Sequence, residues 1–282
     1  MKKILVLTDG KAGHENQSKA FARALGLEYD IAKVNFKSKA HKSLSYLLGR
    51  FGVYTRRLFD VECEEGYAAV IGAGSGVFYA VRTMSRLMGV NCAVVLYPRG
   101  YRIGDFDCVL APAFDRPAKR ENVIEIPCNL VATDENFYLE GVRKFRSLRG
   151  SAAERRAVAV VIGGPNKCAG MDAEWMRCEL QKIFQENCDC EFWVTTSRRT
   201  PTEVENVVDS FPWDYKLIYS RDHFNPIPAF VNLADRLYVS AESTGMISEA
   251  CTFGSSEVLL IDNLNGGRHK FRRFVEMMKA GG

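Results

Sequence analysis

The sequence predicts an α/β fold of two Rossmann-like domains, each with a parallel sheet that faces a shared cleft. Short apolar runs rich in β-branched residues alternate with stretches of helical periodicity. The alternation lapses once, near the middle of the chain, and then restarts. Parallel strands joined by crossover helices produce such an alternation, and the lapse separates two sets of them.

The first half, residues 1–145, is expected to form the N-terminal domain. Its strand-like runs, each ending in turn residues, are KILVLT, YDIAKV, YAAVIG, NCAVVLY, CVLAP and VIEIP. Helical periodicity is clearest over residues 14–25 and 77–88. Around residues 134–156 the chain is charged and lacks a strand pattern, so we expect a linker there, which can be partly helical.

The second half, residues 146–282, is expected to form the C-terminal domain. Its strand-like runs are AVAVVIGG, CEFWVTT, YKLIYS, RLYVS and EVLLI. Helices are predicted over residues 172–186 and 244–253, and the segment GGRHKFRRFVEMM predicts a final amphipathic helix.

The composition is that of a globular protein, with 47% apolar and 26% charged residues. No apolar run reaches the roughly 18–20 residues that span a bilayer. The start, MKKILVLTDG, has the basic pair of a signal peptide, but its apolar run of about five residues is too short for one. It is better interpreted as a first strand, and we expect a cytoplasmic protein.

Nine cysteines are present without a CxxC pair, which favours a reduced protein with no structural zinc site. The net charge of 38 − 34 = +4 is too small for a dedicated nucleic-acid binder, so no nucleic-acid partner is expected.

Residues 31–59 contain no Asp or Glu, although they are rich in cations and large apolar side chains. The cations are Lys33, Lys37, Lys39, Lys42, Arg50, Arg56 and Arg57. Such a segment can lie as a peripheral contact on the inner face of an anionic membrane or receive an acidic, lipid-linked substrate. The alternative is a core helix with a solvated basic face.

Ligands of Rossmann-like folds lie beyond the carboxyl ends of the strands, and this rule selects the turns that matter. These are residues 8–14, 72–76, 97–100, 163–167, 195–200 and 240–248. In the first of them, His14 stands where the helix after ILVLTDGKAG begins.

The second turn, GAGSG, is similar to a dinucleotide fingerprint but has the spacing GxGxG, and the next strand ends without a ribose-binding acid. An NAD site is therefore not favoured, and a simple tight turn is the alternative. Asp105 and Asp107 of DFD precede a strand and so lie at the wrong sheet edge for a ligand, which argues against a metal site.

Three turns of the second half suit an anion or a sugar. Gly163 and Gly164 follow a strand directly, where missing Cβ atoms permit close approach. Arg198 and Arg199 offer paired donors to a diphosphate. SAESTGMISEA leads into a helix whose free amides attract anions, and Glu249 lies in that helix with a carboxylate for a vicinal diol. Ordinary helix capping is the alternative for each turn alone.

The segments TDGKAGHENQS, TTSRRTP, MISEA and HKFRRF, in this order, resemble the mitochondrial fission ELM family, which is similar to GT-B glycosyltransferases. YPRGYRIGDFDCVLAPAFD resembles a further segment of that family. The chain differs in having Phe114-Asp115 for His-Asp, Glu242-Ser243 for Asp-Ser, and no Pro after the glycine of FGSSEVLL.

The resemblance implies a GT-B-like fold with an acceptor site in the first domain and a nucleotide-sugar site in the second. It implies that the donor is faced by Gly163, Gly164, Ser197, Arg198, Arg199, Ser243, Met246, Ser248 and Glu249, with Asn166 and Thr200 in the same turns. Glu249 would bind the ribose. Lys270 and Arg272 would lie near the cleft, although surface solvation explains them equally well.

The first turn also resembles that of the lipid-linked GlcNAc transferase of peptidoglycan synthesis, which ends in Gly-His before its helix. The positive end of a helix dipole disfavours imidazolium, so His14 is expected to stay neutral and accept a proton from the acceptor hydroxyl. The alternatives for His14 are a hydrogen bond within the turn, or contact with the acceptor or a phosphate without proton transfer. Asp9 and Asp115 are the competing carboxylates. On the acceptor side we expect Gly13, Asn16, Gly74, Ser75 and Arg99.

These observations predict a metal-independent glycosyltransferase without a cofactor, whose substrate is a nucleotide diphosphate sugar. The acceptor is expected to be lipid-linked or an envelope glycan. Two alternatives remain open: a nucleotide-sugar epimerase of the same fold, and a non-catalytic adaptor that binds a partner or a membrane.

Overall fold

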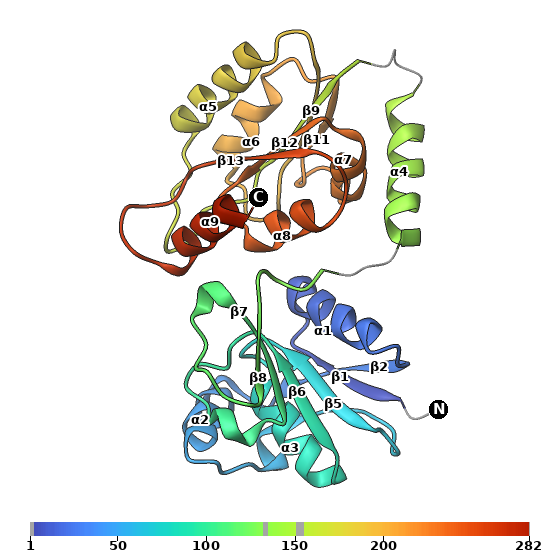
Figure 1. Cartoon of the computed structure of the whole chain (residues 1–282), viewed down its shortest axis with the longest axis vertical. Coiled ribbons are helices and arrows are strands. Elements are labelled where there is room, and N and C mark those ends of the chain that lie inside the picture. The colour runs from blue at the N-terminus through green and yellow to red at the C-terminus, as the bar shows by residue number, and fades with distance from the viewer. Residues whose placement is uncertain (1–2, 132–134, 151–154, 282) are drawn as a thin grey trace. The chain divides into compact units, whose positions relative to one another are not determined.

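The computed structural model describes residues 3–131, 135–150 and 155–281. The chain divides into two compact units, residues 1–133 and residues 134–282 (Figure 1). Each unit has a main sheet of its own, and the strand pairs within these two sheets are parallel. The predicted α/β class with two Rossmann-like domains is therefore confirmed.

The main sheet of the first unit has the strand order β2-β1-β5-β6-β7-β8. Its strands are β1 (Ile4–Thr8), β2 (Tyr29–Lys33), β5 (Ala69–Ala73), β6 (Asn91–Val95), β7 (Cys108–Pro112) and β8 (Val123–Ile126). The helices are α1 (Ala12–Ala24), α2 (Lys39–Arg50) and α3 (Phe78–Met88), and β3 (Asn35–Phe36) pairs with β4 (Phe59–Asp60) as a separate antiparallel hairpin. The six predicted strands and both predicted helices are present.

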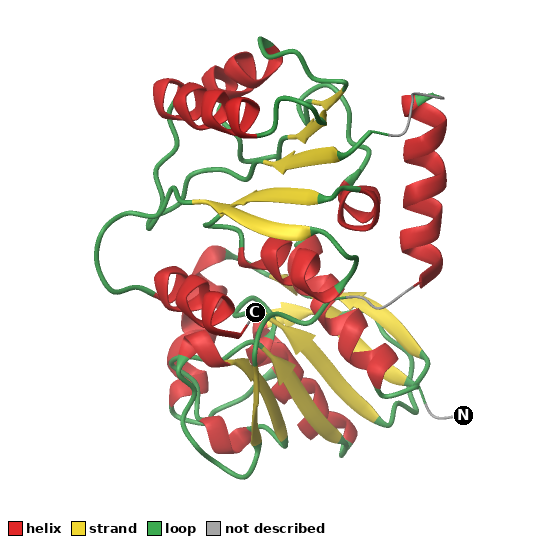
Figure 2. Cartoon of the chain, turned by 45° about the horizontal axis from the view of Figure 1, so that its top comes forward, coloured by secondary structure: helices red, strands yellow, loops and turns green. Residues whose placement is uncertain are grey.

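Burial explains why these strands form. All five residues of β1 are buried, and its backbone pairs with β2 on one side and β5 on the other. Helices flank the parallel strands (Figure 2), so a central strand meets apolar side chains on both faces and reads as a continuous apolar run. Among the described residues, no helix combines the length and apolar character that a bilayer-spanning segment needs.

The main sheet of the second unit has the order β11-β10-β9-β12-β13. Its strands are β9 (Ala157–Val161), β10 (Glu191–Thr195), β11 (Tyr215–Leu217), β12 (Arg236–Ser240) and β13 (Glu257–Ile261). The helices are α4 (Glu135–Arg149), α5 (Ala173–Glu186), α6 (Thr202–Asp209), α7 (Ile227–Leu233), α8 (Thr244–Thr252) and α9 (Lys270–Gly281). The five predicted strands and three predicted helices are present, whereas α6 and α7 were not foreseen.

The segment expected to be a linker is mostly helix. α4 packs beside α7 (Figure 1), and its Phe145 is fully buried, with ring centroids 4.8 Å from Trp193 and 5.6 Å from Phe230. Arg149, also on α4, forms a bidentate ion pair with the buried Glu191. These contacts assign α4 to the second unit, so the predicted boundary after residue 145 falls inside this helix. Residue 134 and residues 151–154 of the predicted linker lie outside the described residues.

In both sheets the strand order reverses once. The chain moves outward from β1 to β2 and returns beside β1 as β5, and it moves outward from β9 through β10 to β11 and returns beside β9 as β12. At such a switch point the two crossover connections leave on opposite sides of the sheet, which opens a crevice at the carboxyl ends of the strands. The turns after β1 and β5, and those after β9 and β12, are therefore the places to examine.

Candidate functional site

Asp9 and His14 form a hydrogen-bonded pair at the switch point of the first unit. His14 Nδ1 lies 3.1 Å from both carboxylate oxygens of Asp9. The Asp9 side chain is buried, and Lys11 contacts it with its backbone N–H at 3.2 Å and its Nζ at 3.1 Å. Burial by itself would raise the pKa of Asp9, but the hydrogen bond from Lys11 and the charge of His14 lower that pKa below its usual value. An ionised carboxylate only accepts hydrogen bonds, so Nδ1 is the donor and Nε2 is the nitrogen that can take a proton.

Two glycines of the GAGSG turn after β5 make room for this pair. A Cβ atom built on Gly74 would lie 2.4 Å from Cε1 of His14, and one on Gly76 would lie 2.5 Å from Oδ2 of Asp9. Gly74 also has a φ of +84°, which a residue with a side chain rarely adopts. The glycines thus do more than tighten a turn, because their missing side chains admit the imidazole and the carboxylate.

Asp115 pairs with Arg99 in the same unit. Arg99, in the turn after β6, donates to the main-chain carbonyl of Asp115 and lies 3.3 Å from its Oδ1. Asp115 is buried in the short 3-10 helix that follows β7. Of the two competing carboxylates, Asp9 is the one that the structure places on His14.

The remaining residues predicted for the acceptor side lie at the surface. Gly13 and Asn16 are exposed on α1, and Ser75 is exposed in the turn after β5. The carbonyl of Ser75 accepts a hydrogen bond from the hydroxyl of Tyr46 on α2 at 3.2 Å. The first turn of α1 and the glycine turn therefore carry the predicted acceptor residues on an accessible surface.

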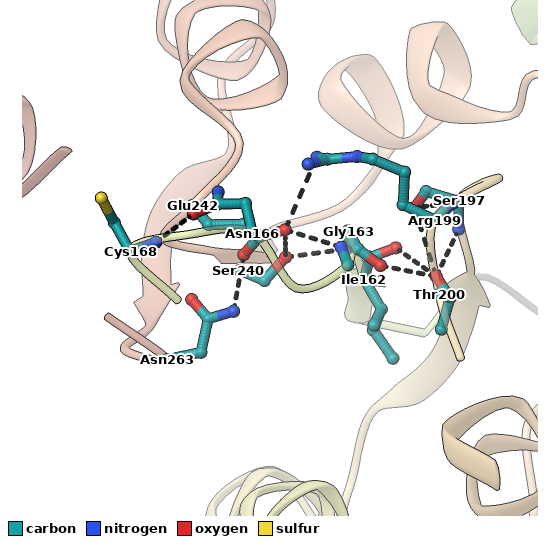
Figure 3. A network of polar contacts seen from close by, with 11 residues as sticks. Ile162, Gly163, Asn166, Cys168, Ser197, Arg199, Thr200, Ser240, Glu242 and Asn263 are labelled. Atoms are coloured by element: carbon teal, nitrogen blue, oxygen red, sulfur yellow. Dashed lines mark hydrogen bonds and ion pairs between the residues drawn. The ribbon is translucent and has the colours of Figure 1, made fainter. Parts of the chain in front are cut away.

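Glu242 connects the turns of the second unit (Figure 3). Its side chain is fully buried, and its Oε1 accepts from the N–H of Gly164 at 2.8 Å and from the hydroxyl of Ser240 at 3.2 Å. Its Oε2 accepts from Nδ2 of Asn263 at 2.8 Å, and the guanidinium of Arg199 lies 4.0 Å from Oε1. One carboxylate thereby joins the segments that follow β9, β10, β12 and β13.

The glycine pair after β9 is required by this internal packing. A Cβ atom on Gly163 would lie 1.8 Å from Oε1 of Glu242, and one on Gly164 would lie 2.2 Å from the carbonyl of Arg199. The N–H groups of both glycines donate within the protein, to Ser240 and to Glu242. The space left by their missing side chains is filled by protein atoms, which differs from the expectation that it admits a ligand.

The SRRT turn after β10 is braced by its hydroxyl groups. The hydroxyl of Thr200 accepts from the backbone N–H of Ser197 at 2.8 Å and donates to the carbonyl of Gly163 at 2.5 Å. The N–H of Arg199 donates to the hydroxyl of Ser197 at 3.2 Å. Ser197 and Thr200 thus fix the loop that carries the two guanidinium groups.

A cavity of about 590 Å³ lies where these turns meet. It is lined by Asn166, Lys167, Cys168, Arg199, Glu242, Ser243, Thr244, Gly245, Lys270 and Phe271. Three predicted turns contribute to it, and its volume is that of a typical small-molecule site. Three cationic side chains and the first residues of α8 line it, so its charge suits an anionic ligand.

The α8 helix carries three further residues predicted to face the donor. Ser248 is buried, and its hydroxyl donates to the carbonyl of Thr244 one turn earlier. Met246 is partly exposed. The Oε1 of Glu249 accepts from the hydroxyl of Tyr138 on α4 at 3.2 Å. Burial raises the pKa of the Glu249 carboxyl, and the hydrogen bond from Tyr138 offsets part of that increase.

The two aspartates of DFD accept hydrogen bonds from within the protein. The hydroxyl of Tyr54 donates to Asp105 at 2.9 Å, and the N–H of Cys92 donates to Asp107 at 2.8 Å. Both precede β7, at the amino end of the strand, as predicted. Within the described ranges, no three His, Cys, Asp or Glu side chains form a group that could hold a metal ion.

Some of the residues predicted to face the donor line the cavity, and others do not. Asn166, Arg199 and Ser243 line the cavity. The exposed Arg198 is absent from its lining, as are the α8 residues Met246, Ser248 and Glu249. Glu242 was noted in the sequence only as a departure from a family motif, and its connecting role was not foreseen. Its position between a strand end and a helix start was the available signal.

Comparison with known proteins shows the fold. The co-structure of S. aureus MnaA with UDP is similar with a TM-score of 0.54 and 14% identity, over 98% of this chain and 82% of that chain. The UDP-GlcNAc 2-epimerase from Neisseria meningitidis, bound to UDP-GlcNAc, is similar with a TM-score of 0.54 and 10% identity. The match covers 99% of this chain and 91% of that chain. Such low identities show a shared GT-B-type fold and do not transfer an activity. No curated protein matches the chain.

The family indicated by TDGKAGHENQS and the later motifs is confirmed by the family comparison. The model described as Mitochondrial fission ELM1 matches residues 12–282, which is nearly the whole chain. The chain belongs to the mitochondrial fission ELM1 family.

Proposed function

We propose that this chain is a metal-independent glycosyltransferase that moves a sugar from a nucleotide diphosphate to a lipid-linked or envelope glycan acceptor. The cavity of the second unit carries the proposal. Arg199, Lys167 and Lys270 line one space of about 590 Å³ beside the start of α8. Guanidinium, ammonium and helix amide groups together are the donors that recognise a diphosphate.

The same groups suit the chemistry of the leaving diphosphate. Negative charge grows on it as the bond from the anomeric carbon to the phosphate oxygen breaks. Arg199 is held near the buried Glu242 and is therefore positioned before the donor binds. We propose that Arg199, with the two lysines, stabilises this charge without a divalent ion.

His14 is the proposed base for the acceptor. Its Nδ1 is held by Asp9, which leaves Nε2 to take the proton of an acceptor hydroxyl as that oxygen attacks the anomeric carbon. Asp9 keeps the imidazole in the required tautomer and stabilises the imidazolium that forms.

Uridine diphosphate sugars are the proposed first donors. The two solved structures named above contain UDP and UDP-GlcNAc, in proteins of the same fold. We propose that the Glu249 carboxylate, which Tyr138 orients, binds the ribose diol.

Epimerisation of the nucleotide sugar is the second candidate, because the same solved structures include an epimerase. An epimerase needs several acid and base groups around one sugar. Among the described residues that line the cavity, Glu242 is the single carboxylate, and hydrogen bonds from three groups occupy it. The carboxylate of this cavity is thus engaged within the protein, which favours transfer to a separate acceptor.

The test is calorimetric titration of the full chain with UDP, ADP and their sugars, in Mg²⁺ and in EDTA. We expect one nucleotide to bind equally well in both, and Arg199→Ala to weaken its binding about 10- to 100-fold. Arg198→Ala is the matched control, since it removes a neighbouring guanidinium that does not line the cavity. Failure of every nucleotide to bind would favour the adaptor, and turnover of the donor sugar without an acceptor would favour the epimerase.

A further inference from the structure

Helix α2 packs against its unit through small residues. Ser45 and Gly49 are its buried residues, and a Cβ atom on Gly49 would lie 2.7 Å from the ring of Tyr101. The helix backbone therefore lies close to the tyrosine ring. Besides these small residues, Leu48 is partly buried and packs against the core cluster of this unit.

Apart from Leu48, the large apolar side chains of α2 and of the turn after it are exposed. Leu44, Leu47 and Phe51 follow at helical spacing on one side, with Phe51 68% exposed and Leu47 55% exposed. Tyr46 and Val53 are exposed beside them. We call Leu44, Leu47, Phe51 and Val53 the α2 stripe. The alternative of a core helix in residues 31–59 accounts for Leu48, Ser45 and Gly49, which face the core, but not for the α2 stripe, which faces outward.

Positive charge lies on α2 itself, which carries Lys39, Lys42 and Arg50. The segment from residue 31 to residue 59 has seven Lys and Arg side chains and no Asp or Glu. Two more guanidinium groups come from other elements: Arg86 donates to the carbonyl of Gly52 at 3.3 Å, and Arg102 lies beside the same glycine. The nearby Asp105 is largely buried and lies between these two arginines, at 3.9 and 4.0 Å, so its charge is compensated.

We propose that the α2 stripe docks on an anionic membrane surface. The apolar side chains would enter the boundary between headgroups and acyl chains, while the nearby Lys and Arg side chains contact lipid phosphates. Charge complementarity favours this occupant, since an apolar stripe with cationic side chains beside it fits an anionic lipid surface. Tyr46 ties α2 to the carbonyl of Ser75, so the docked surface lies beside the glycine turn that holds His14.

The test is co-sedimentation of the full chain with phosphatidylcholine vesicles made with and without phosphatidylglycerol. We expect binding only to the anionic vesicles, and weaker binding at high salt. Leu47→Ser and Phe51→Ser should each reduce binding at least about tenfold, because each removes apolar area from the lipid boundary. Arg50→Glu should reduce it as well. All three variants should keep the melting temperature, since the altered side chains are exposed.

Leu148→Ser is the matched control. Leu148 is 54% exposed on α4 of the other unit, and its replacement should leave vesicle binding unchanged. The proposal is overturned if the full chain binds neither vesicle, if it binds neutral vesicles equally well, or if the stripe variants bind like the control. Self-association that Leu47→Ser abolishes would also overturn it, by showing that a second copy covers the stripe.

Discussion

His14 and Asp9 share a bifurcated hydrogen bond, in which one ring nitrogen lies 3.1 Å from each carboxylate oxygen. Asp9→Asn should therefore lower kcat about 10²- to 10⁴-fold, because an amide can present its own N–H and no longer requires Nδ1 to be the donor. Initial rates of sugar transfer at saturating donor measure this effect. Asp189→Asn, at an exposed position, should keep the wild-type rate. A rate for Asp9→Asn within threefold of wild type would remove Asp9 from the proposed mechanism.

The glycine turn should be intolerant of a single methyl group. Gly74→Ala and Gly76→Ala would each place a Cβ atom about 2.5 Å or less from the His14 or Asp9 side chain. We expect a loss of stability of about 1–3 kcal/mol together with a loss of turnover. Gly104→Ala is the control, since a Cβ atom there meets nothing within 4 Å. Thermal melting and initial rates decide the matter, and alanine variants that melt and turn over like the control would contradict the packing argument.

Glu242 should matter for both folding and nucleotide binding. Glu242→Ala leaves the buried N–H of Gly164 and the amide of Asn263 without their acceptor, at a cost of about 1–3 kcal/mol for each group. Arg199 also loses its carboxylate partner, so nucleotide binding should weaken. Glu257→Ala removes an exposed glutamate from the same sheet and should change stability by less than about 1 kcal/mol. Denaturant unfolding and calorimetric titration test the two effects, and equal behaviour of the two variants would refute the connecting role.

Glu249 should give stability an unusual pH dependence. Its pKa is raised in the folded chain, so the folded state keeps a proton that the unfolded state releases above about pH 4.5. The contribution of Glu249 to the free energy of unfolding is therefore greatest below that pH. It falls as the pH rises through the pKa that Glu249 has in the folded state. Glu249→Gln removes the dependence and should raise the melting temperature at neutral pH but not near pH 4. Melting curves over this range test the sign, with the exposed Glu276→Gln as the control.

The strands could be predicted because parallel strands are buried on both faces and appear as apolar runs such as AVAVV. The α4 helix was not predicted as part of the second unit because charged side chains surround its buried aromatic residues, Tyr138 and Phe145. The sequence also placed Asp9 and His14 in one turn. It could not show that Asp9 contacts the imidazole. The glycines that make room for this pair, Gly74 and Gly76, lie about 60 residues away in the sequence. The role of Glu242 escaped prediction for the same reason: Gly164 is 78 residues distant and Asn263 is 21.

Each unit has its own sheet and its own buried cluster, and the two candidate sites fall on different sheets. Each unit can therefore report the binding of its own ligand through its own thermal unfolding transition. A ligand raises the melting temperature of the unit that binds it. The free energy of stabilisation grows with the logarithm of the ligand concentration divided by its Kd. A scanning calorimetry trace that resolves into two transitions would thus assign an unidentified acceptor or nucleotide to its half of the chain, without a single substitution.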